Sequence, residues 1–233
     1  MNFELAVLIW IVGLGPLLDI PLTRWLKRSS HPGRRIYVYI LTMASLLLCT
    51  AALWPSQQWR LLESPFGSAP RGLQFVAWAL VAAMVMNTVQ VALMVRRSPE
   101  QRLAVHHAYS GLGFFLPTTT AERRWFVGVA LAAGIFEEIL FRSFVIRFFD
   151  GLPLWGSALT SCALFGIAHL YQGWKHALGT LIMALLFTVI VAGTQTLVVA
   201  MLVHALWDFR VLMFMLLEGH PLLEAPPTAS ESA

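Results

Sequence analysis

The sequence has little charge and little cysteine. Asp, Glu, Lys and Arg make up only 12% of its 233 residues, whereas 58% are apolar. A soluble globular domain carries about 25% charged residues, so this chain has roughly half the charge that would cover a globular surface. With two cysteines it is no disulfide-stapled scaffold, and its apolar content excludes a disordered chain. The composition predicts a polytopic membrane protein.

Seven apolar stretches approach the roughly 20 residues that cross a bilayer core about 30 Å thick. They run over 3–22, 36–54, 73–95, 125–147, 152–171, 177–193 and 196–217. The first lacks the basic start and small-residue cleavage site of a signal peptide, so we expect a retained helix. The connection 96–124 contains an apolar piece suited to an interfacial or re-entrant helix, in which His106 and His107 are predicted interfacial residues. The predicted fold is an all-α transmembrane bundle of about seven to eight spans.

The chain shows no internal repeat and no second domain. Residues 1–218 are predicted to form one membrane-embedded domain, and 219–233, rich in Pro, Ala, Ser and Glu, a disordered tail. Cys49 and Cys162 fall within predicted spans without metal-ligand spacing, so we expect buried, small apolar side chains.

Basic residues gather in the loops after the first, third and fifth spans, and loops rich in Lys and Arg stay in the cytoplasm. These residues are Arg24, Lys27, Arg28, Arg34, Arg35, Arg96, Arg97, Arg102, Arg123, Arg124 and Lys175. Only Arg60, Arg71 and Arg147 lie on the other side. We therefore predict an outside N-terminus and a cytoplasmic C-terminus. The short chain favours a prokaryotic inner membrane. The net charge of +4 is a topology signal, so we expect membrane lipids and no nucleic acid as partners.

The fourth span carries three ionisable residues, each costing at least about 2.5–3.5 kcal/mol in hydrocarbon. Glu138 and Arg142 are four residues apart, about 40° around an α-helix, so they can form an intramembrane ion pair. Glu137 points about 100° away from Glu138 and has no cation on its own helix. A carboxylate beside a fixed ion pair is available as a base.

The fifth and seventh spans add further polar residues. His169 follows Phe165 by four residues, and Asp208 follows His204 by four. His204 and Asp208 therefore face the same way and could together hold a ligand, a water or a metal ion. Each motif alone has a structural explanation. The Glu138–Arg142 pair, for example, could simply neutralise a buried Arg, which needs a partner wherever it lies. Their joint occurrence in three spans predicts one polar cluster.

Taken in order, the three motifs resemble the signature of the CPBP intramembrane proteases, the CAAX-protease and bacteriocin-processing (Abi) family that includes the Ras-converting enzyme. The motifs are Glu137-Glu138-x-x-x-Arg142, Phe165-x-x-x-His169 and His204-x-x-x-Asp208. The resemblance covers about residues 121–218, which would form the catalytic core.

The resemblance implies a role for each motif residue. Glu137 would activate a water held by His169 for attack on a peptide carbonyl. Glu138 and Arg142 would support the site. His204 and residue 208 would complete the polar pocket as an oxyanion or metal shell.

Position 208 departs from the commoner form of the family, which has Asn there. An ionised Asp208 only accepts hydrogen bonds, so it would orient His204 or join a metal shell. That shell would contain His169, His204 and Asp208, with Glu137 as a further candidate ligand, around a divalent metal such as zinc. The choice between a metallo-type and a glutamate-type enzyme stays open, and the absence of an HExxH motif excludes an ordinary zincin.

The leading hypothesis is an intramembrane endopeptidase that hydrolyses membrane-associated peptides or protein tails, CAAX-like tails among them. A proton-linked transporter is an alternative, although no paired repeat halves support it. A non-catalytic immunity or scaffold protein is a third, although it would not need ionisable groups in hydrocarbon. His169 lies near the cytoplasmic end of its span, so either that helix continues to Trp174 or the site is slanted and open to the cytoplasm.

Overall fold

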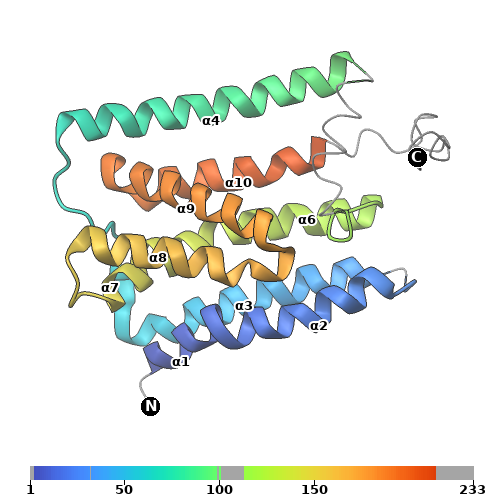
Figure 1. Ribbon diagram of the computed structural model, residues 1–233, viewed down its shortest axis with the longest axis horizontal. Helices are drawn as coiled ribbons and strands as arrows, with labels where there is room; N and C mark the ends of the chain where they lie inside the picture. The colour runs from blue at the N-terminus through green and yellow to red at the C-terminus, as the bar shows by residue number, and fades with distance from the viewer. Residues whose placement is uncertain (1–2, 32, 99, 101–112, 214–233) are drawn as a thin grey trace, which may run out of the picture.

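A computed structural model describes residues 3–31, 33–98, 100 and 113–213 of the chain. These residues form seven helical segments that run back and forth alongside one another (Figure 1). The elements are α1 (Phe3–Ile9), η1 (Trp10–Leu14) and α2 (Gly15–Arg28) as one continuous segment; α3 (Arg34–Gln57) followed by η2 (Gln58–Leu62); α4 (Arg71–Arg97); α6 (Thr120–Ala132), η4 (Ala133–Val145) and α7 (Ile146–Phe148) as one segment; α8 (Leu154–Ala168) followed by η5 (Leu170–Gln172); α9 (Trp174–Thr194); and α10 (Leu197–Met213).

This architecture confirms the predicted all-α fold. Five helices are long and apolar enough to cross a membrane: Phe3–Arg28, Arg34–Gln57, Arg71–Met94, Leu154–Gln172 and Trp174–Thr194. The two remaining segments, α6–η4–α7 and α10, correspond to the fourth and seventh predicted spans and contain their ionisable residues. No named strand occurs in the part of the chain that the structure describes. The predictions for His106, His107 and the tail 219–233 lie outside the described residues, as does most of the apolar piece of 96–124.

The segment that carries the first motif lies inside the bundle. In Figure 1, α1, α2 and α3 form one edge and α4 the opposite edge. Between these edges, η4 packs against α10, α3 and α8, while α9 packs against both α4 and α8. Ten of the thirteen η4 residues are buried. The motif side chains of η4 are therefore surrounded by other helices.

Large apolar side chains cover the outer faces of the helices. Phe75 on α4 is 76% exposed and Leu202 on α10 is 67% exposed. Such surfaces suit contact with lipid, because a soluble monomer rarely exposes extended apolar patches. Cys49 and Cys162, by contrast, are buried free thiols, as the sequence predicted.

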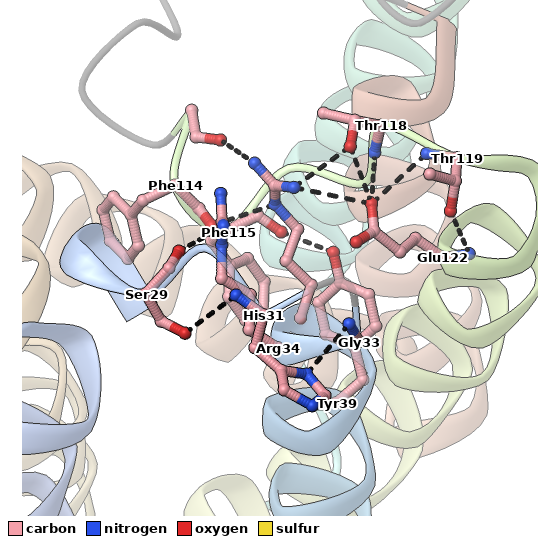
Figure 2. A network of polar contacts seen from close by, with 12 residues as sticks. Ser29, His31, Gly33, Arg34, Tyr39, Phe114, Phe115, Thr118, Thr119 and Glu122 are labelled. Atoms are coloured by element: carbon pink, nitrogen blue, oxygen red, sulfur yellow. Dashed lines mark hydrogen bonds and ion pairs between the residues drawn. The ribbon is translucent and has the colours of Figure 1, made fainter. Parts of the chain in front are cut away.

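The N-terminal end of α6 is fixed by a capping box (Figure 2). The Thr119 hydroxyl accepts a hydrogen bond from the Glu122 backbone N–H at 3.2 Å. The Glu122 carboxylate accepts bonds from the backbone N–H groups of Thr118 and Thr119 at 2.6 and 3.2 Å, and from the Thr118 hydroxyl at 2.9 Å. These bonds satisfy donors that a helix start leaves unpaired.

The same loop is tied to α3. Arg35 Nη1 lies 3.6 Å from the Glu122 carboxylate, and Arg35 donates to the carbonyl oxygens of Gly113 and Phe114. The Tyr39 hydroxyl donates to the Phe115 carbonyl at 2.5 Å, and the Tyr39 side chain is fully buried (Figure 2). The network holds the start of the motif-bearing segment against the second span.

Candidate active site

The first motif lies on a widened helix. Hydrogen bonds within Ala133–Val145 follow the π-helical i→i+5 pattern, which in proteins often marks functional sites. The helix approaches α10 closely at Gly134, where an added Cβ would lie 2.8 Å from both the Cβ and the backbone nitrogen of Ala205. This contact brings the glutamates of η4 next to the His204 turn of α10.

Glu138 and Arg142 form the predicted ion pair, with Oε2 and Nε 3.3 Å apart and both side chains almost completely buried. The guanidinium of Arg142 also lies over the ring of Phe165, the second-motif phenylalanine, at 4.5 Å from its centroid. Cation–π contact adds attraction to a buried guanidinium. The first and second motifs are therefore packed together through Arg142.

His204 stands between the two adjacent glutamates. Its Nδ1 lies 2.8 Å from Oε1 of Glu138, and its Nε2 lies 3.8 Å from Oε2 of Glu137. An angle of about 100° was expected between the glutamates, and both carboxylates of the π-helical η4 nevertheless approach one imidazole. Phe187 of α9 stacks on that imidazole at 4.7 Å between ring centroids, so the ring is held on its face as well.

Asp208 completes this group. Its Oδ2 lies 3.8 Å from His204 Nε2, as the spacing of four residues predicted. The Asp208 side chain is 32% exposed, against 14% for Glu137. The cluster therefore becomes more open from Glu138 through Glu137 to Asp208.

His169 is held at the end of α8. Its Nδ1 lies 2.8 Å from the Phe165 carbonyl oxygen. A carbonyl only accepts, so Nδ1 carries the hydrogen and Nε2 of the neutral ring is an acceptor. The helix ends at Ala168 and a 3₁₀ turn follows, so α8 does not continue to Trp174.

His169 and Glu137 line one cavity of about 300 Å³. The cavity lies between the motif helices and the first two spans, because α2 and α3 supply much of its wall. A volume of this size is at the lower end for small-molecule sites. The third-motif residues His204 and Asp208 are not among its lining residues, although His204 Nε2 lies 3.8 Å from Oε2 of Glu137.

The proposed zinc ligands do not form a ready metal site. No group of three or more His, Cys, Asp or Glu side chains among the described residues is arranged to hold a metal ion. His204 Nδ1 is engaged by Glu138, and His169 belongs to the cavity wall. The metal shell that the sequence suggested stays a prediction.

Two cavity residues were missed by the sequence reasoning. Tyr171 follows the second motif by two residues, and its hydroxyl accepts a bond from Gln172 Nε2 at 2.9 Å. Asp19 projects from α2 into the same cavity. An isolated carboxylate within the first apolar span was the signal available for Asp19, whereas nothing local distinguished Tyr171.

The geometry agrees with a sequence comparison. Residues 119–210 match the family described as type II CAAX prenyl endopeptidase Rce1-like. Over these residues the match bears out the resemblance predicted from the three motifs, and it supports an integral membrane protein. It runs from the start of α6 into α10 and includes all six predicted site residues, while α1 to α4 lie outside it. Comparisons with curated proteins and with solved structures found no match.

Proposed function

We propose that the chain is an intramembrane endopeptidase in which Glu137 is the general base. The Rce1-like match supports this activity class. The observation that carries the residue assignment is the shared cavity of Glu137 and His169, because peptide hydrolysis needs a base and a site for the attacking water in the same space.

In the first step, a water donates one hydrogen to the Glu137 carboxylate and the other to Nε2 of His169. Glu137 removes its proton as the water oxygen attacks the peptide carbonyl carbon. The new C–O bond displaces the carbonyl electron pair onto oxygen. His169 is suited to orient the water because its Nδ1–H is held by the Phe165 carbonyl.

The resulting oxyanion needs a hydrogen-bond donor in the cavity. Tyr171 provides one: since its oxygen accepts from Gln172, its own hydrogen is free to be donated. In the second step the oxyanion electron pair reforms the carbonyl, the C–N bond breaks, and protonated Glu137 transfers its proton to the leaving amine nitrogen. The products are a carboxylic acid and an amine, and Glu137 is ionised again.

Glu138, Arg142, His204 and Asp208 are positioning residues in this scheme. The Glu138–Arg142 pair holds His204 through Nδ1, which aims Nε2 at Glu137 and Asp208. The scheme contains no metal step, and no group of three or more His, Cys, Asp or Glu side chains among the described residues is arranged to hold a metal ion. Membrane-associated peptides or protein tails, CAAX-like tails among them, are the proposed substrates, since the cavity lies among apolar helices.

The test is proteolysis by the purified full-length chain in phosphatidylcholine vesicles. The substrate is a peptide library, and mass spectrometry identifies the products. Glu137→Gln and His169→Ala should each lower the rate by about 100-fold or more. Glu63→Gln and His176→Ala are matched controls outside the cavity lining and should retain activity.

Cleavage by both site variants at the wild-type rate would overturn the assignment. Proton flux lost in Glu137→Gln, without any peptide cleavage by the wild type, would favour the transporter alternative. A wild-type rate abolished by a chelator and restored by zinc would show that a metal is needed, which contradicts the metal-free scheme.

A further inference from the structure

The cavity contains a carboxylate that the proposed reaction does not use. Asp19 of α2 lines the cavity together with Glu137, His169 and Tyr171. It lies within the Phe3–Arg28 span, where an ionisable side chain is costly and marks a candidate functional site. The following inference rests on the proposed endopeptidase function.

The Asp19 carboxylate has no hydrogen-bond or ion-pair partner in the described part of the chain. No hydrogen bond or ion pair joins its carboxylate to another described residue, and the residues that line the cavity include no Lys or Arg. Glu137, the other lining carboxylate, is close to His204. Asp19 is therefore the cavity's available negative charge, in a wall that is otherwise mainly apolar.

The position of Asp19 suits substrate contact. Helix α2 packs against η5, the turn that carries Tyr171 and directly follows His169. A peptide whose scissile bond lies at Glu137 and His169 would place neighbouring side chains against this wall. An ammonium or guanidinium group there would gain a charge-assisted ion pair with Asp19.

We infer that Asp19 forms a specificity subsite for a positively charged side chain, Lys or Arg, next to the scissile bond of the peptide substrate. Asp19 belongs to α2, outside the family match at 119–210, so this preference is a property of the chain's own N-terminal helices. A lipid amine headgroup is the competing source of cation, and the test separates the two.

The experiment uses the full-length chain in vesicles of phosphatidylcholine, which has no primary amine, and the same peptide library. Wild type should enrich Lys or Arg at one position flanking the cleaved bond. For a peptide pair that differs only by Lys or norleucine at that position, wild type should favour Lys by at least about tenfold in kcat/KM. Asp19→Asn should abolish the preference while still cleaving the norleucine peptide, and Asp19→Lys should favour Asp or Glu there.

Asp150→Asn is the matched control, because Asp150 is exposed in the turn before α8 and does not line the cavity. A wild type without cationic preference, or an Asp19→Asn profile equal to that of wild type, overturns the inference while leaving the endopeptidase intact. It is also overturned if phosphatidylethanolamine raises the thermal stability of wild type but not of Asp19→Asn while both share one cleavage profile. Failure of the proposed endopeptidase function gives a different result. In that case the wild type would cleave neither the Lys nor the norleucine peptide, or Glu137→Gln would still cleave both.

Discussion

Nδ1 of His204 lies 2.8 Å from Oε1 of Glu138, although 66 residues separate them in the sequence. Glu138 also faces Arg142 through its second oxygen, so one buried carboxylate holds a cation on its own helix and an imidazole on another. The buried Glu138 carboxylate therefore joins the first motif to the third.

The Glu138–Arg142 pair should show strong energetic coupling. Arg142→Met alone or Glu138→Leu alone leaves the other charge buried and unpaired, which should cost about 3–5 kcal/mol of unfolding free energy. The double variant should cost less than the sum of the two, by about 1–3 kcal/mol. Reversible unfolding of the purified chain in mixed detergent micelles measures these values.

A matched pair from the same helical segment provides the control. The control combines Glu122→Leu with Arg142→Met. These side chains are 20 residues apart, about 30 Å along the helix, so their costs in unfolding free energy should add within about 0.5 kcal/mol. Additive costs for Glu138 and Arg142 would show that their 3.3 Å approach carries no coupling.

The features that local pattern determines could be predicted from the sequence. Apolar runs of about 20 residues predict the spans, and spacing of four residues predicts the Glu138–Arg142 and His204–Asp208 approaches. Features that depend on contacts between distant helices could not. The π-helical η4 accompanies close packing on α10, and the positions of Asp19 and Tyr171 in one cavity depend on how α2 meets η5.

Tyr171→Phe should lower kcat by about 100- to 1000-fold, because it removes one donor to the oxyanion without changing the shape of the ring. KM should change by less than about twofold, since the interaction forms in the transition state. Steady-state kinetics on one cleaved peptide give both constants. Tyr37→Phe is the control, because Tyr37 is 54% exposed and lies outside the cavity lining. A rise in KM with unchanged kcat would assign Tyr171 to substrate binding instead.

Stability should fall in acid through Glu122. Burial tends to raise the pKa of Glu122, but the bonds from Thr118, the charge of Arg35 and the bond from Thr119 lower it below the ordinary value of 4.5. The unfolded chain therefore binds a proton at a higher pH than the folded chain. The stabilisation is complete above about pH 4.5 and is lost as the pH falls through the folded pKa.

Thermal unfolding between pH 7 and pH 3 measures this dependence. Glu122→Gln should be less stable than wild type at pH 7, and the gap should narrow in acid. Glu63→Gln serves as the control, because the pH profile of wild type should persist in it. A gap that stays constant down to pH 3 would assign the loss to the side chain's shape and not to its charge.

Gly134→Ala should separate η4 from α10. Its new Cβ would lie 2.8 Å from the Ala205 Cβ and 2.9 Å from the Met201 carbonyl oxygen, on a neighbouring helix that cannot yield by a side-chain rotation alone. Overpacking of this kind costs about 1–3 kcal/mol.

Because Glu137 faces His204 across the same contact, proteolysis should fall as well, through kcat more than KM. Gly179→Ala on α9 is the matched control, since its added Cβ meets nothing within 4 Å and alanine favours a helix by up to about 1 kcal/mol over glycine. Equal stability and activity in both alanine variants would mean that the close approach at Gly134 does not position the site.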